Sequence, residues 1–594
     1  MKNKLKKNQN KIIAAGFLLV LIVISAVFFD AYYDLNDDVL MKDILAGNYT
    51  GTPESRNIQM LWGISAFISL LYRIMRPLPW YGLFLCICQW GALYAIEARS
   101  LRLCHGIKKQ LLVGLAETLI FAALMWNHFV FLQYTITCTM LAAAASFLLL
   151  TTDSKLLVKE FIVANIPSVL LIGLAFLIRS EMLLLVSPLV GVSGFLKWSY
   201  EEKPFAKENF QKYLTICFAM VFMLVFGQIS HNIAYGSKEW KAFTELFNQR
   251  TELYDYQSIP PYESHKDFYE RIGLTKEEQV LFENYNFGMD DKIDEQIMGE
   301  MATYAKSVNS KKTPFANRLK DKTKEYIYRI THGPNSVGCD YPFNVFALLL
   351  YGANLLGIIY VKGENGKTTK VRKAFYMGLR LLLVFACRTS LWMYILLGNR
   401  VPDRISHSLY FMEIIVLGGL FFSLMQKNIS GKTVPAYQFF IILCATLFSL
   451  MLIPGKYMDI EKESVERERV NDSYNELYTY LKSHKESFYF IDVYSSVSYS
   501  EKMFYRVDNT FDNFDIMGGW ASKSPLTKKK YAYAGLDSME EALLKDNVYF
   551  VKKKDEDMNW ISDYYASFGV TTEESLSIAL NKEFEIWSIK KINP

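Results

Sequence analysis

The chain is a succession of long apolar runs joined mostly by short loops that are rich in lysine and arginine. Twelve runs approach the roughly 20 residues that an α-helix needs to cross a bilayer: 12–29, 58–72, 80–96, 111–126, 129–150, 161–178, 182–197, 212–229, 343–361, 375–397, 408–425 and 436–453. Hydrophobic residues make up 51% of the 594 positions and charged residues 21%. This pattern excludes a disordered, fibrous or cytosolic globular chain and predicts a polytopic α-helical membrane protein.

The basic loops predict the orientation of the spans, because lysine and arginine gather on the cytoplasmic side of a membrane. If all twelve runs cross, the basic loops from Arg99 onward lie outside. If 58–72 does not cross, these basic loops lie inside together with the N-terminal lysines. Their basic residues are Arg99, Arg102, Lys108, Lys109, Lys155, Lys159, Lys197, Lys203, Lys207, Lys212, Lys362, Lys367, Lys370, Arg372, Lys373, Lys427 and Lys432. We therefore predict eleven spans, with 58–72 as an interfacial or re-entrant helix whose ends are covered by protein.

Three segments then lie outside the membrane: 30–79, 230–342 and 455–594. We predict a transmembrane domain over 1–453 and an extracytoplasmic domain over 454–594. The insertion at 230–342 is expected to be helical, with a capping box at Thr275–Glu278. In the tail, helices near 472–484, 538–546 and 557–568 alternate with strands at 488–493, 548–551 and 584–589. This alternation predicts a small α/β domain.

The loop after the first span, Asp30 to Asn57, is strongly acidic. Asn36 is expected to cap a short helix over 37–46 that ends at Gly47. At about 100° per residue, the apolar side chains of this helix form one stripe, with Asp37 in its middle and Asp38 on its flank. A carboxylate aimed at the membrane-facing side is unfavourable unless it serves a function.

The motif Asn36-Asp37-Asp38, with Gly47-Asn48-Tyr49 behind it, stands directly after the first span. In this position it resembles the acidic loop of the GT-C glycosyltransferase superfamily, to which oligosaccharyltransferases, protein O-mannosyltransferases and the lipid A aminoarabinose transferase belong. The resemblance covers the architecture of the whole chain. It implies a GT-C-like fold of about 11 transmembrane helices with interfacial loop helices. The tail is not of a type that identifies an acceptor.

The resemblance implies that Asp37 or Asp38 acts as base for an acceptor hydroxyl that attacks a sugar on a polyprenyl phosphate. A positioned base contributes about 10²–10⁴-fold to such a step. The structural alternative is that both aspartates only complement the positive end of a short helix. The expected partners are membrane lipids, a lipid-linked sugar as co-substrate and an envelope or other cell-surface glycan as acceptor, at the outer face of a bacterial plasma membrane.

Three arginines outside the membrane are candidates for the donor phosphate, since a guanidinium suits bidentate phosphate binding. Arg400 and Arg404 lie in one outer loop, where Asp403 or Glu413 are alternative partners, and Arg179 lies in an outer turn beside Glu181. Within the spans, Arg388 and Glu117 are expected to pair with each other. His128 and His231 are expected to be hydrogen-bonded interfacial histidines.

No paired Cys/His spacing indicates a zinc site, although a divalent cation remains open as a cofactor. The sequence holds no phosphate loop of the Walker type and no recognition-helix pattern, so no nucleic-acid partner is expected. The main alternative function is a transporter or flippase of lipid-linked saccharides, and a polymerase shares the chemistry of the transferase. A transporter is expected to show paired broken helices and a midplane repeat, and neither is evident in the sequence.

Overall fold

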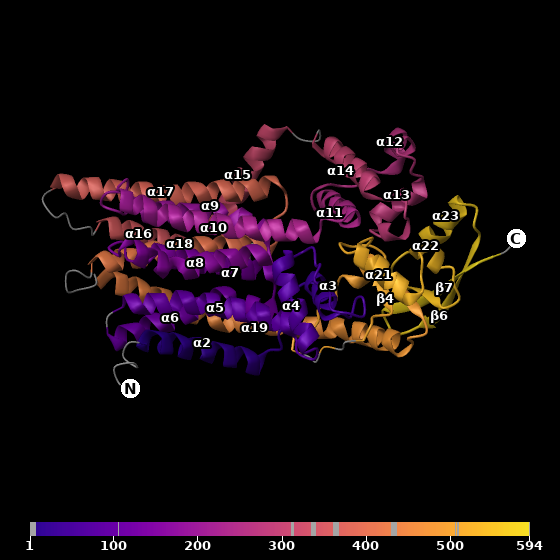
Figure 1. The fold of residues 1–594 in the computed structure, drawn as a ribbon, viewed down its shortest axis with the longest axis horizontal. Coiled ribbons are helices and arrows are strands. Elements are labelled where there is room, and N and C mark those ends of the chain that lie inside the picture. Colours follow the sequence, from indigo (N-terminus) through magenta and orange to yellow (C-terminus); the bar gives the residue numbers. More distant parts are fainter. Residues whose placement is uncertain are drawn as a thin grey trace.

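The computed structural model describes residues 8–104, 106–310, 314–333, 340–359, 367–428, 436–504, 507 and 510–592. A bundle of long helices occupies most of it (Figure 1). One helix lies over most of each of the eleven predicted spans: α2 (Gln9–Phe28), α5 (Trp80–Leu103), α6 (Ile107–Val130), α7 (Tyr134–Leu150), α8 (Val158–Ile178), α9 (Ser180–Ser199), α10 (Lys207–Ala234), α16 (Phe343–Ile359), α17 (Lys367–Leu397), α18 (Asp403–Asn428) and α19 (Ala436–Ser483). The predicted span 129–150 begins in α6 and β2 (Phe131–Leu132), and the predicted span 343–361 ends outside the described residues. Among the described residues, nine helices are long and apolar enough to cross a membrane, and α7 and α16 are shorter apolar helices.

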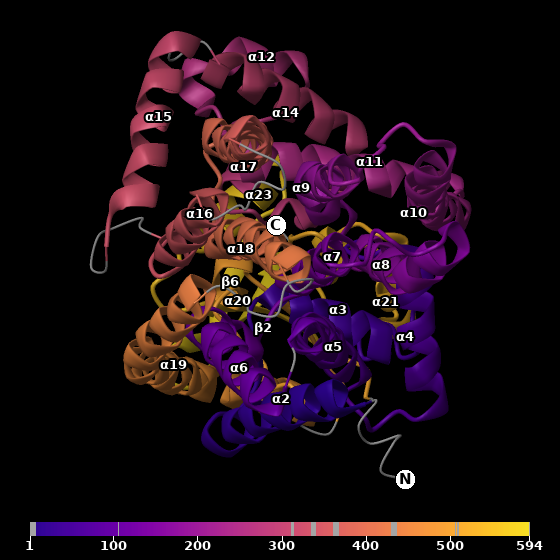
Figure 2. The same ribbon diagram turned by 90° about the vertical axis from the view of Figure 1, so that its left-hand side faces the viewer.

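The bundle has a buried centre and an apolar periphery. Every residue of α7 is buried, and Figure 2 shows this helix in the middle of the end-on view. On α10, by contrast, large apolar side chains are exposed, including Phe218 and Phe222, each at 70%. An aqueous protein does not expose such a continuous apolar surface, so these faces are suited to contact lipid.

The run at 58–72 forms the short helix α4 (Trp62–Ile74), which crosses the direction of the bundle helices at one end of the bundle (Figure 1). The predicted cover by protein is found at its start but not at its end, where Ile74 and Met75 are exposed. At its start, the backbone N–H of Leu61 donates to the carbonyl of Leu177, and that of Trp62 donates to Nδ1 of His231. At its end, Trp80 Nε1 donates to the carbonyl of Met75.

The three predicted outer segments lie together at the end of the bundle opposite the start of α2 (Figure 1). The turns from α7 to α8 and from α9 to α10, which contain Lys155 and Lys203 in the sequence, lie at the other end, where α2 begins (Figure 1). Lys362 and Lys432 lie outside the described residues. One end of the bundle therefore carries the acidic loop, the insertion and the tail.

We expect a reporter fused after residue 594 to report the extracytoplasmic side, and a reporter inserted after Lys155 to report the cytoplasmic side. The reason is that helix parity and the positive-inside bias agree for both positions. Paired alkaline phosphatase and green fluorescent protein fusions measure this. A cytoplasmic tail would refute the eleven-span topology.

The insertion is helical, as predicted. Its elements are α11 (Lys238–Tyr256), η1 (Tyr262–Ser264), α12 (Lys266–Arg271), α13 (Lys276–Glu283), η2 (Phe287–Met289), α14 (Glu295–Ser310) and α15 (Phe315–Thr331). The predicted capping box is present, because Thr275 Oγ1 accepts from the N–H of Glu278 and Glu278 Oε2 accepts from the N–H of Thr275.

The tail contains a five-stranded mixed sheet in the order β4-β3-β5-β7-β6. Its elements are β3 (Phe488–Ile491), α20 (Val493–Ser496), β4 (Phe514–Ile516), α21 (Pro525–Ala534), α22 (Met539–Ala542), β5 (Val548–Lys553), α23 (Asn559–Ser567), β6 (Thr572–Ala579) and β7 (Phe584–Lys591). Strand β3 is parallel to β4 and β5, whereas β7 is antiparallel to β5 and β6. The α/β character is confirmed, whereas β4, β6, α20 and α21 were not predicted from the sequence.

The tail is joined to the bundle without a linker, because α19 continues from 436 to 483 through Pro454. The division placed at residue 454 falls inside this helix and stays a prediction. The tail also holds the first outer loop. Strand β1 (Tyr32–Tyr33) pairs in parallel with β2 (Phe131–Leu132), and Lys502 forms an antiparallel bridge to Tyr32. The loop between α2 and α4 is thus clamped between the bundle and the tail.

Candidate functional site

The acidic loop folds into the helix α3 (Asn36–Ala46). Gly47 ends it with φ of 99°, as predicted, and donates its N–H to the carbonyl of Asp43. The expected cap at Asn36 is wrong by one residue. Leu35 occupies the N-cap position in extended conformation, and no side chain caps the helix. The reason is that the β1–β2 pairing, continued by the bond from Asp34 N–H to the carbonyl of Leu132, holds the chain extended up to residue 35.

Asp38 is completely buried, and Tyr81 donates a 2.7 Å hydrogen bond to its Oδ1. Its Oδ2 has no hydrogen-bond partner among the described residues. Burial raises the pKa of Asp38 well above its ordinary value, while the Tyr81 hydrogen bond and the charge of Arg404 oppose the shift. Burial therefore favours the protonated form of Asp38 over the carboxylate.

Asp37 is half-buried, so the predicted orientation of the pair is reversed. The expectation assumed that α3 lies on the membrane with only its apolar stripe covered. Instead, residues of α5 and the tail pack around α3, and its buried face centres on Asp38, Met41 and Leu45. The accessible carboxylate of the pair is that of Asp37.

Because Asp38 is buried and its pKa is raised, we predict that the effect of Asp38→Asn on thermal stability depends on pH. Between the ordinary pKa near 3.8 and its raised folded value, Asp38 keeps a proton when folded and loses it when unfolded. Its contribution to the free energy of unfolding therefore falls as pH rises through that window. Asparagine has no such titration. We expect the melting temperature of Asp38→Asn, relative to the unchanged protein, to increase as the pH rises above about 4. A constant difference would show that Asp38 is ionised in the folded protein.

Asp37 interacts electrostatically with residues from three other segments of the chain. Its charge acts on Tyr134 at the start of α7, on Arg179 before α9, and on Tyr285 in the insertion. None of the hydrogen bonds or ion pairs found among the described residues involves the Asp37 carboxylate. Its surroundings are thus polar and partly cationic, and its oxygens are available for a ligand.

Arg179 is held in place, and its predicted pairing with Glu181 is confirmed at 3.2 Å. It also donates to Gln59 Oε1 at 2.6 Å and lies over the ring of Tyr134, 5.1 Å from its centroid. Burial lowers the pKa of the Arg179 guanidinium, but Tyr134, Glu181 and Asp37 outweigh this and the net shift is upward. Arg179 is thus a fixed positive charge within reach of Asp37.

The two arginines of the outer loop differ in their contacts. Arg400 forms an ion pair with Asp255 of α11 and lies over the ring of Tyr256. This partner is neither of the two expected ones. Arg404, in the first turn of α18, forms no hydrogen bond or ion pair among the described residues. Its charge acts on Asp34 and Asp38. Arg404 is the guanidinium that is available to bind an anion.

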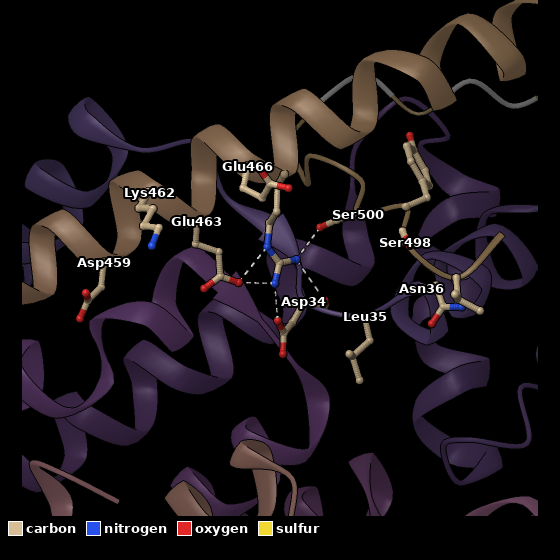
Figure 3. Close-up of a pocket in the computed structure, with 12 residues that line it drawn as sticks. Asp34, Leu35, Asn36, Asp459, Lys462, Glu463, Glu466, Ser498 and Ser500 are labelled. Carbon is tan, nitrogen blue, oxygen red and sulfur yellow. Dashed lines mark hydrogen bonds and ion pairs between the residues drawn. The ribbon is translucent and has the colours of Figure 1, made fainter. Parts of the chain in front are cut away.

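Arg467 is a residue that the sequence analysis missed. From the outer extension of α19 it pairs with Asp34 at 2.8 Å and donates to Ser500 Oγ at 2.6 Å. These contacts lie in a cavity of about 530 Å³ between α19, residues 34–36 and residues 497–500 (Figure 3). In the sequence, nothing around Arg467 indicates that its partner is Asp34, 433 positions away. Its role is to tie the tail to the start of α3.

The expected pairing of Arg388 with Glu117 is wrong. Arg388 Nε donates to Glu413 Oε2 at 2.7 Å, and both side chains are buried within the bundle. The reason is that α17 contacts α18, whereas Glu117 lies on α6 at the other side of the bundle (Figure 2). The two histidines are hydrogen-bonded, as expected: His128 with His407, and His231 with the N–H of Trp62.

Metal-ligating residues do not cluster in the part of the chain that the structure describes, where no group of three or more His, Cys, Asp or Glu side chains is arranged to hold an ion. A divalent cation at Asp37 and Asp38 would need further oxygen ligands from a bound substrate. Phosphate oxygens and water commonly supply these for Mg²⁺.

Comparison with known proteins finds a similarity in structure but none in sequence families. No protein-family model and no curated protein matches the chain. Among solved structures, the chain is similar to the crystal structure of ArnT from Cupriavidus metallidurans bound to undecaprenyl phosphate. The TM-score is 0.37 and the identity 10%, over 96% of this chain and 98% of that one. Such a likeness assigns no residue a role.

Proposed function

We propose that the protein is a membrane glycosyltransferase that moves a sugar from a polyprenyl-phosphate carrier to a hydroxyl acceptor outside the plasma membrane. One observation carries the proposal. At the outer end of the bundle, the charges of Asp37 and Arg404 both act on the buried Asp38, and neither the Asp37 carboxylate nor the Arg404 guanidinium forms a hydrogen bond or ion pair among the described residues. A base and an anion-binding group are the two parts that such a transfer requires.

In the proposed reaction, Asp37 accepts the proton of the acceptor hydroxyl. The acceptor oxygen then forms a bond to the anomeric carbon of the donor sugar, and the bond from that carbon to the phosphate oxygen breaks. The polyprenyl phosphate leaves with the electron pair of the broken bond. Asp38 is buried and its pKa is raised, so its proposed part is to position α3 through Tyr81 rather than to accept the proton.

The phosphate is proposed to bind at Arg404. This residue lies in the first turn of α18, and a helix N-terminus favours an anion. Arg179 adds a second positive charge near Asp37. Arg400 remains a candidate, although its pair with Asp255 must open before it can bind. The exposed apolar faces of the bundle offer the polyprenyl chain a lipid environment beside this end.

The test is to incubate the purified protein in nanodiscs with a panel of radiolabelled polyprenyl-phosphate sugars, with and without a chelator. We expect one donor to lose its label to an added glycan acceptor or, more slowly, to water. If the chelator abolishes this transfer, a divalent cation is required and binds together with the donor. Intact donors throughout, together with their movement across proteoliposomes, would favour a flippase. Products that lengthen processively would identify a polymerase.

A further inference from the structure

A second cavity, of about 500 Å³, lies between α3 and the tail. It shares the lining residues Asn36 and Tyr499 with the cavity around Arg467, so it begins beside that cavity. We call it the α3 groove. Asn36 directly precedes Asp37, so the groove reaches the chain position beside the proposed base.

Aromatic side chains form one wall of this second cavity. Tyr478 of α19 stacks on Phe514 of β4, with ring centroids 5.0 Å apart. Tyr499 meets Tyr478 edge to face at 4.9 Å. All three rings are only partly buried and line the cavity. The partly negative face of an aromatic ring attracts C–H groups, which the apolar face of a sugar ring presents.

The lysines of the cavity already have anionic partners, and this bears on the charge of the ligand. Lys42 pairs with Asp43 and Glu501, Lys482 with Asp512, Lys502 with Asp30 and Glu468, and Lys530 with Asp515. Carboxylates outnumber lysines among the lining residues. An anionic ligand would have to break these pairs and approach the carboxylates, so the cavity favours an uncharged ligand.

Polar groups without a partner lie on the rim of the same cavity. The side chains of Asp472 and Asn475 on α19 and of Asn36 on α3 form no hydrogen bond among the described residues. Asp472 and Asn475 are exposed. Carboxylate and amide groups can hydrogen-bond neighbouring hydroxyls of a sugar, accepting from them and, in the amides, donating to them.

We infer that the α3 groove binds an uncharged, hydroxyl-rich saccharide, stacked on Tyr478 and Phe514 and hydrogen-bonded by Asp472 and Asn475. Its identification as the acceptor rests on the proposed function, since one end of the groove reaches Asn36 beside Asp37. The binding of a saccharide does not depend on transfer. The site therefore assigns the class of acceptor, a neutral glycan rather than a charged polymer.

Binding can be measured by fluorescence polarisation with the full chain in nanodiscs. The probes are fluorescently labelled neutral tetrasaccharides of glucose, galactose, mannose, rhamnose and N-acetylglucosamine, and an acidic tetrasaccharide of galacturonic acid. Asn475→Trp fills the groove, whereas Glu476→Trp adds the same bulk at the next, exposed position, which does not line it. We expect one neutral probe to bind, Asn475→Trp to weaken it about tenfold or more, and Glu476→Trp to leave it unchanged.

Asp472→Ala keeps the shape of the cavity and is expected to weaken the same probe, which guards against a folding defect in the tryptophan variant. Binding of the acidic probe alone, binding of no probe, or equal binding to both tryptophan variants would overturn the inference. Cleavage of the polyprenyl-phosphate donor is measured in parallel. Saccharide binding without donor cleavage by the unchanged protein would refute the transferase and leave the saccharide site standing.

Discussion

Replacement of Asp37 by asparagine should lower the rate of sugar transfer by roughly 100-fold or more while the protein stays folded. Asparagine keeps the size of the side chain and much of its hydrogen bonding but cannot accept a proton. Asp37 is half-buried and has no partner among the described residues, so its loss leaves no buried charge behind. The measurement is the turnover rate at saturating donor and acceptor, with thermal unfolding followed in parallel.

Asp38→Asn is the matched control, because it changes the neighbouring carboxyl, which is buried and whose pKa is raised. It should retain far more activity than Asp37→Asn, since Tyr81 can still donate to the amide oxygen. A larger loss in Asp38→Asn would make the buried residue the base. If a folded Asp37→Asn/Asp38→Asn protein is fully active, the loop-base mechanism is wrong, and a transporter becomes the stronger hypothesis.

The helices of the membrane part were predictable because the bilayer imposes one rule on all of them. Each span needs about 20 apolar residues whose backbone groups are satisfied within the helix. The predicted number of spans, eleven, depended on whether 58–72 crosses the membrane. The short helix α4 shows why an apolar run alone was insufficient to decide this. Its ends are satisfied by Leu177, His231 and Trp80, which are contacts that no local pattern encodes.

The position of the site was predictable, but its orientation was not. A helical wheel finds the apolar stripe of α3, yet it does not show what covers the other faces. In the structure, Lys42 pairs with Glu501 of the tail, 459 positions away in the sequence, and Tyr81 reaches Asp38 from α5. These long-range contacts bury Asp38 and leave Asp37 accessible. The same applies to Arg388, whose partner Glu413 depends on which helices are neighbours.

The tail strands whose side chains are mostly buried were predicted, and the two whose side chains are not were missed. Phe488–Ile491 is wholly buried and reads as a strand from composition alone. β6 is an edge strand whose residues are mostly exposed and polar, so its sequence lacks the apolar alternation of a half-buried strand. β4 has only three residues, too few for a pattern.

Replacement of Arg404 by glutamine should raise the KM for the polyprenyl-phosphate donor roughly 10- to 100-fold. Hydrogen bonds to a charged group contribute about 1.5–3 kcal/mol, and each 1.4 kcal/mol changes an affinity about tenfold. Arg404 has no partner among the described residues, so its removal leaves no carboxylate unpaired. Glutamine keeps a hydrogen-bond donor but removes the charge. Steady-state kinetics at varied donor concentration, together with direct binding of the donor, measure the effect.

Arg400→Gln is the matched control, four residues away in the same outer loop. Because Arg400 is engaged by Asp255, its replacement should disturb the contact between this loop and α11 more than the affinity for the donor. The two variants therefore separate a phosphate ligand from a structural ion pair. A large rise in KM for Arg400→Gln with no change for Arg404→Gln would move the phosphate to Arg400 and place it beside α11. If both variants bind the donor as tightly as the unchanged protein, the outer loop does not contribute to the donor site. Arg179 is then the remaining candidate, since its positive charge interacts with Asp37.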